Sequence, residues 1–173
     1  MAETLVPAGT WNVDTSHSAL AFRIRYLGIL DVNGRFTQFE GTVDASDPAS
    51  PSTTITAQTA SIDTGFPQRD EHLRNADFFD AEANPTVVFA SKGVTANADG
   101  TFAVAGELTL HGATNPVTLT ATATGTGTDP WGQSRAAVHA TGTIDRGNDI
   151  CAEDRRSTRS PLPVGPDLLR GER

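Results

Sequence analysis

The sequence predicts an all-β fold, an antiparallel barrel of about eight strands with one short helix acting as a lid. Apolar and polar residues alternate with period two in three successive runs, 102–110, 117–124 and 136–144, as expected of strands with one buried face. The turn signals Asp99-Gly100 and Asp129-Pro130 mark hairpins of such a meander. A meander of this length normally closes on itself and so hides its edges.

One segment, residues 62–89, interrupts the strands. Asp70 and Glu71 suit the start of a short helix, where carboxylates meet the positive end of the helix dipole. The apolar side of this helix would consist of Leu73, Phe78 and Phe79. We expect the helix to be the lid of the barrel.

The interior of the predicted barrel mixes large and small residues. In the run 19–26, Phe22 and Ile24 lie on the apolar face, whereas Arg23 and Arg25 face water. The last three strands carry small residues at interior positions: Gly106, Ala121, Ala123, Ala136, Ala140 and Gly142. A barrel of about eight strands can just fill itself with side chains, so these residues could leave room for one small ligand. Alternatively, they only relieve crowding at tight bends.

The formal net charge of −8 argues against several classes of partner. Nucleic acid and anionic membrane surfaces attract clustered basic residues, and Lys92 is the only lysine. No run reaches the roughly 20 apolar residues that span a bilayer. The N-terminus also lacks the pattern of a signal peptide. We therefore expect a cytoplasmic protein with neither a nucleic-acid partner nor a membrane span.

The reactive residues form no recognisable catalytic or metal site. The four histidines are never two or four positions apart, so we expect no metal and no cofactor. The chain contains no G-x-S-x-G elbow, and His17 beside Ser16 and Ser18 is interpreted as a turn residue. The single cysteine, Cys151, can form no internal disulfide. The protein is therefore predicted not to be an enzyme.

A series of motifs runs through most of the chain. They are W-x-V-D-x-x-H-S from Trp11, G-R-F-x-x-F-x-G from Gly34, S-I-D-T from Ser61, R-D-x-H-L-R-N-x-D-F-F-D from Arg69, N-P-x-V-x-F from Asn84, G-E-L-T-L-H-G-A-T-x-P-V from Gly106 and I-D-R from Ile144. With these motifs, residues 9–146 resemble the YceI-like polyisoprenoid-binding family. The resemblance implies an antiparallel lipocalin-like barrel. It also implies binding of a long isoprenoid, such as a polyprenyl pyrophosphate or a quinone-like lipid, for storage or transport.

Such a ligand would place its apolar chain inside the barrel. The residues expected to line this chain are Phe22, Ile24, Tyr26, Phe36, Phe89, Leu108, Leu110, Leu119 and Val138, with Leu73, Phe78 and Phe79 in the lid. Arg69 and His72 would meet a polar or pyrophosphate head group at the barrel mouth through charge-assisted hydrogen bonds. Alternatively, the charged residues of this segment form only a solvated helix face.

The resemblance ends after Arg146. The following residues hold no alternating apolar run long enough to close a barrel, so the last strand is doubtful. We predict a loose leader over residues 1–9, a barrel domain over 10–146 and a divergent, poorly ordered tail over 147–173. The strand at 136–144 would then have an exposed edge, which could recruit a second chain into a homodimer.

Two other functions stay open. One is a small enzyme that acts on lipidic substrates at the lid, with Asp70, His72 and Arg74 as its acid–base group. The other is a solid barrel that acts through its surface or as a dimer. Whether the barrel interior admits a ligand distinguishes the last alternative from isoprenoid binding.

Overall fold

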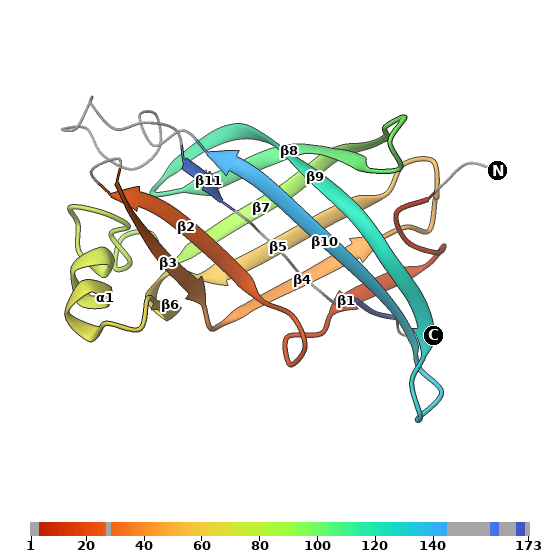
Figure 1. The fold of residues 1–173 in the computed structure, drawn as a ribbon, viewed down its shortest axis with the longest axis horizontal. Coiled ribbons are helices and arrows are strands. Elements are labelled where there is room, and N and C mark those ends of the chain that lie inside the picture. The colour runs from red at the N-terminus through yellow and green to blue at the C-terminus, as the bar shows by residue number, and fades with distance from the viewer. Residues whose placement is uncertain (1–3, 27–28, 145–159, 163–168, 172–173) are drawn as a thin grey trace.

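A strongly curled antiparallel sheet forms the body of the protein (Figure 1). The computed structural model describes residues 4–26, 29–144, 160–162 and 169–171. In sheet order the strands are β1 (Thr10–Val13), β4 (Phe39–Asp44), β5 (Ser52–Gln58), β7 (Thr86–Ala96), β8 (Phe102–Leu110), β9 (Ala113–Thr128) and β10 (Ser134–Ile144). Every neighbouring pair is antiparallel, which confirms the predicted fold class.

A second, smaller sheet lies at one end of the barrel, beside the helix (Figure 1). It consists of β2 (Leu20–Tyr26), β3 (Leu30–Phe36) and β6 (Ile62–Asp63). The short 3-10 helix Thr59–Ser61 leads from β5 into β6. The side chain of Phe22 is buried and those of Arg23 and Arg25 are exposed, as the alternation predicts.

The helix α1 (Pro67–Arg74) is the predicted lid, but it is shorter than expected. Pro67 is in its first turn. Backbone N–H groups in the first turn of a helix have no partner within the helix, so proline, which lacks this group, loses no hydrogen bond there. The N–H of Asn75 donates to His72 O at 3.2 Å and ends the helix. Phe78 and Phe79 therefore follow the helix in a turn region, and the expectation that they form its apolar side is wrong.

Two very short strands complete the sheet. β12 (Leu169–Gly171) pairs with β1 and with the beginning of β10, and β11 (Ser160–Leu162) pairs with the end of β10. This corrects the expected loss of the last strand. A three-residue strand closes a sheet through backbone hydrogen bonds alone, so it leaves no alternating run in the sequence. Most of the predicted tail lies outside the described residues, namely 147–159 (which include Cys151), 163–168 and 172–173. The predicted poor order of these residues therefore stays a prediction.

The predicted leader also differs from the structure. Residues 1–3 lie outside the described residues, but Val6 is only 3% exposed and packs in the core. Gly9 and Ala45 exchange backbone hydrogen bonds of 3.2 and 2.9 Å, which extend the pairing of β1 with β4. Residues 4–9 are thus attached to the barrel through the buried Val6, the half-buried Leu5 and the backbone of Gly9, whereas Pro7 and Ala8 are exposed.

Apolar side chains fill the fold in two clusters. The barrel cluster consists of Val6, Trp11, Val43, Ala45, Phe89, Phe102, Val104, Val117, Leu119, Ala121, Ala136, Val138, Ala140 and Ile144. The lid cluster consists of Phe22, Phe36, Ala57, Ile62, Leu73, Phe79 and Leu110. Leu108 packs against both clusters, so apolar side chains run continuously from Trp11 to α1.

Candidate functional site

Among the described residues, a small space lies in the barrel interior. Its volume is about 40 Å³, close to the roughly 30 Å³ that a water molecule occupies in the liquid. The space is lined by Leu5, Val6, Val13, Val43, Thr53, Ile55, Phe89, Val104, Leu119, Ala121, Val138 and Ala140. An isoprenoid chain does not fit in this volume while the side chains keep these positions.

Large neighbours occupy the room beside the small interior residues. A Cβ atom on Gly142 would lie 2.4 Å from Leu119 Cδ2, and one on Gly106 would lie 2.7 Å from Phe89 Cζ. At Gly106 and Gly142, the missing side chains therefore leave room for Phe89 and Leu119 and not for an empty space. Ala123 differs from the others, because its side chain is exposed.

The residues predicted to line a ligand chain separate between the two clusters. Phe89, Leu119 and Val138 belong to the barrel cluster, and Leu108 joins the clusters. The others that the structure places are in or against the lid cluster: Phe22, Ile24, Phe36, Leu73, Phe78, Phe79 and Leu110. Tyr26 pairs with Leu30 through its backbone, and its side chain lies outside the described residues.

At the α1 end, charged side chains of the helix bind the chain segment 60–64, which precedes it. Arg74 donates to Ala60 O at 2.8 Å and to Ile62 O at 2.9 Å. Arg69 donates to Thr64 Oγ1 at 2.7 Å and to Thr64 O at 2.9 Å. The guanidinium groups therefore bind the chain that precedes the helix.

Asp70 is the buried charged residue of this end. It is 6% exposed, and its Oδ1 accepts a hydrogen bond from Thr64 N at 2.8 Å and another from the Thr64 hydroxyl. His72, by contrast, is exposed and meets the ring of Phe78 edge-on, with ring centres 4.8 Å apart. Asp70 and Arg74 thus serve the local fold, and these contacts do not assemble an acid–base group with His72.

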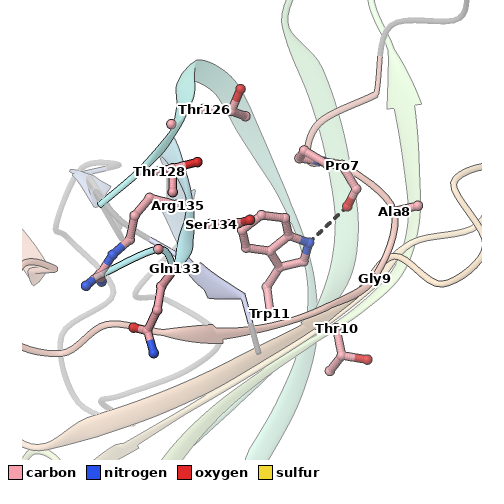
Figure 2. A pocket seen from close by; sticks show the side chains of 12 residues that line it. Pro7, Ala8, Gly9, Thr10, Trp11, Thr126, Thr128, Gln133, Ser134 and Arg135 are labelled. Carbon is pink, nitrogen blue, oxygen red and sulfur yellow. Dashed lines mark hydrogen bonds between the residues drawn. The ribbon is translucent and has the colours of Figure 1, made fainter. Parts of the chain in front are cut away.

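The opposite end of the barrel opens into a wide polar hollow, which we call the funnel. Its volume is about 810 Å³, and residues 7–11, 126–128 and 132–135 line it. Figure 2 shows the indole of Trp11 between the chain at Pro7 on one side and Ser134 on the other. The lining offers the hydroxyl groups of Thr10, Thr126, Thr128 and Ser134 and the amide of Gln133.

The segment 5–11 borders both the funnel and the interior space. Leu5 and Val6 line the small enclosed space, whereas residues 7–11 line the funnel. Trp11 Nε1 donates to Pro7 O at 2.9 Å, as the dashed line in Figure 2 marks. The burial of this segment was not predicted from the sequence, although the apolar pair Leu5-Val6 shortly before a tryptophan is a signal for burial.

An ion cluster stands beside the funnel. Arg135 forms an ion pair with Asp14 and another with Asp129, the latter at 2.9 Å between Nη2 and Oδ2. Hydrogen bonds from Ser16, followed by those from His17 and Arg135, hold the pKa of Asp14 well below its ordinary value, against the opposing effect of burial. The N–H of Gln133 is the main cause that lowers the pKa of Asp129, with a further contribution from Arg135.

Comparison with known proteins identifies the family. The profile of the YceI-like domain matches residues 11–148, which is most of the chain. The chain belongs to the YceI-like family. A UPF0312 protein of Serratia proteamaculans is 45% identical to this YceI-like chain over 130 residues, which cover 74% of the chain and 67% of that relative.

Solved structures of the same fold agree with the family. The YCEI protein of Campylobacter jejuni is 24% identical, matches with a TM-score of 0.75 and is covered completely, as is this chain. A domain of Saccharophagus degradans, described as polyisoprenoid-binding and implicated in plant cell wall breakdown, matches with a TM-score of 0.60 at 14% identity. That comparison covers 95% of this chain and 99% of the domain.

The described part of this YceI-like chain holds neither a cluster of metal ligands nor a membrane-spanning helix. Within residues 4–26, 29–144, 160–162 and 169–171, no three His, Cys, Asp or Glu side chains gather as metal ligands would. In the same residues, no helix has both the length and the apolar character needed to cross a bilayer.

Proposed function

We propose that this YceI-like protein binds a long isoprenoid lipid, with the apolar chain inside the barrel, and stores or carries it without changing it. The observation that carries the proposal is the continuous apolar interior, in which Leu108 joins the barrel cluster to the lid cluster. The polyisoprenoid-binding domain of Saccharophagus degradans has the same fold and adds support.

The hydrophobic effect supplies enough affinity for this function. Burial of one CH₂ group contributes about 0.8 kcal/mol, so burial of some ten carbons would contribute about 8 kcal/mol before the cost of ordering. No specific polar contact is needed along the chain. A quinone-like lipid and a polyprenyl pyrophosphate would share this part of the site and differ at the polar end.

The small volume of the space beside Leu5 and Val6 limits what can enter without a movement of side chains. The space that Leu5 and Val6 line has a volume of about 40 Å³, so a chain bound there must take space that the protein's own side chains now occupy. The barrel cluster includes Val6 and the lid cluster includes Leu73, and both come from segments outside the main strands. Movement of such a segment costs fewer backbone contacts than movement of a strand.

Extraction of the purified protein tests the proposal. The protein is expressed in a bacterial host, purified without added lipid, extracted with organic solvent and examined by mass spectrometry. We expect a polyprenyl compound that is absent from a control protein purified in parallel. A titration with geranylgeraniol, followed by retention of the alcohol on gel filtration, provides the second measurement. Absence of any isoprenoid in both measurements, with well-folded protein, would contradict the function.

The solid barrel is the second candidate, because the closed interior favours it. In that case the protein would act through its surface, and neither extraction nor titration would give a lipid. A recovered isoprenoid that leaves the protein unchanged would exclude this alternative. Chemical conversion of the lipid during incubation would instead favour the alternative of a small enzyme that acts on lipidic substrates.

A further inference from the structure

The two ends of the barrel are held in different ways. At the α1 end, Arg74 binds two backbone carbonyl groups at 2.8 and 2.9 Å, and the buried Asp70 binds both Thr64 N and the Thr64 hydroxyl. Charge-assisted hydrogen bonds of this kind are about twice as strong as neutral ones. Leu73 and Phe79 add buried apolar surface. Both side-chain hydrogen bonds and buried apolar side chains therefore hold the helix in place.

The segment 4–9 at the other end has fewer attachments. In the described part of the chain, its hydrogen bonds are those of Gly9 with Ala45 and that of Pro7 O with Trp11, all near the start of β1. Val6, at 3% exposure, supplies most of the burial that keeps the segment in the barrel. The segment can therefore swing out about Gly9 while β1 stays paired with β4.

We propose that the funnel is the portal of the barrel, and that a lipid enters when segment 4–9 swings out and gives up the places of Leu5 and Val6. This inference rests on the proposed isoprenoid binding. The segment borders both spaces: Leu5 and Val6 line the space of about 40 Å³, and residues 7–9 line the funnel of about 810 Å³. Its departure joins the two spaces and exposes the apolar residues that Leu5 and Val6 now cover.

The lining of the funnel also suits one end of the ligand. With the apolar chain in place of Val6, the polar end would lie among the hydroxyl groups of Thr126, Thr128 and Ser134. These groups both donate and accept hydrogen bonds, so they fit a hydroxyl or a carbonyl oxygen. The sequence had predicted the head group at Arg69 and His72, at the other end of the barrel.

Tryptophan fluorescence gives a direct test of the segment's movement. The chain has two tryptophans, Trp11 at 4% exposure and Trp131 at 82%. Trp131 lies in the β9–β10 turn outside the funnel lining, so Trp131→Phe leaves Trp11 as the only reporter. We expect geranylgeraniol to change the emission wavelength of Trp11 and its quenching by acrylamide, because Pro7 O leaves the indole when the segment moves. Binding with neither change overturns the proposal.

A pair of variants compares the two ends. Val6→Asp puts a carboxylate into the barrel cluster and favours the open segment, whereas Arg74→Ala loosens α1. We expect Val6→Asp to raise the association rate of geranylgeraniol roughly tenfold or more, because the binding-competent state is then more populated. Arg74→Ala should leave that rate close to that of the wild type. Val6→Ala is a milder variant with the same expected direction, and Val6→Ile is the apolar control.

The outcomes separate this inference from the function on which it rests. Faster loading of the Val6→Ala and Val6→Asp proteins, with unchanged circular dichroism, supports the portal. Binding by the wild type with faster loading only of Arg74→Ala overturns the portal and leaves isoprenoid binding intact. Failure of the wild type and every variant to bind geranylgeraniol or geranylgeranyl pyrophosphate overturns both.

Discussion

Arg135 and Asp14 form an ion pair that ties β10 to the turn after β1, although the two residues are 121 positions apart in the sequence. The same guanidinium binds Asp129 in the β9–β10 turn. Asp129 and Asp14 in turn raise the pKa of Arg135, so the arginine keeps its charge. The cluster fixes the hairpin beside the funnel relative to the first strand.

The first prediction is that this cluster makes the protein sensitive to acid. The pKa values of Asp14 and Asp129 lie below their ordinary 3.8 in the folded chain. Their contribution to the free energy of unfolding is therefore complete above that pH and is lost as the pH falls through the folded-state values. Urea unfolding should show a loss of stability that begins as the pH approaches 3.8 and grows as the pH falls below it.

The matched variant for this prediction is Asp14→Asn. It removes one titrating group, and we expect a loss on the order of 1 kcal/mol near neutral pH. We also expect a smaller decrease on acidification than in the wild type. If the two proteins lose the same stability between neutral and acid pH, Asp14 does not contribute as the ion pair implies.

The second prediction concerns Gly142, whose missing side chain leaves room for Leu119. A Cβ atom there would lie 2.4 Å from Leu119 Cδ2. We expect Gly142→Ala to lower the free energy of unfolding by about 1–3 kcal/mol, as overpacking does. Gly106→Ala should cost more, because its Cβ would lie 2.5 Å from the carbonyl oxygen of Ala90, which is backbone and cannot turn aside.

A double mutant checks the cause of this loss. Leu119→Val removes the clashing methyl group, so Gly142→Ala should cost less in that background, with a coupling of about 0.5–3 kcal/mol. Thermal or urea unfolding of the four proteins gives the value. Additive effects would mean that Leu119 does not oppose the new methyl group.

The alternation of side chains was enough to predict the fold from the sequence. Phe102, Val104 and Leu110 alternate with outward residues along β8, and all three are buried as this pattern requires. Position 106 was harder to interpret. A glycine between large residues can mean either an empty space or a neighbour that fills it, and only the position of the Phe89 ring decides between them.

The two ends of the barrel show why the candidate site was only partly predictable. Arg69 and His72 were expected at the mouth from their charge and their place in the helix, but their contacts depend on Thr64 and on Phe78. Val6 carries no periodic signal because the apolar pair Leu5-Val6 stands alone between Thr4 and Pro7. Its burial follows from the way in which Gly9 pairs with Ala45, which local pattern does not reveal.

The third prediction tests the apolar path between the clusters. Leu108→Asn places an amide where Leu108 contacts both clusters, and the residue is only half-buried, so the fold should tolerate it. An unpaired amide beside the lipid chain costs about 1–3 kcal/mol, so we expect the affinity for geranylgeraniol to fall roughly tenfold. Ala105→Asn, at an exposed position of the same strand, is the control. Equal affinities of the two variants would contradict a chain path past Leu108.

The fourth prediction is that Asp70 stabilises the fold and does not act as a catalytic acid. The carboxylate is 6% exposed and accepts hydrogen bonds from both Thr64 N and the Thr64 hydroxyl. Asp70→Ala should therefore lower the free energy of unfolding by about 1–3 kcal/mol, because the half-buried N–H and hydroxyl groups of Thr64 lose their acceptor. Asp70→Asn keeps an acceptor oxygen and should lose less. A lipid-converting activity that disappears in Asp70→Asn at unchanged melting temperature would instead support the enzyme.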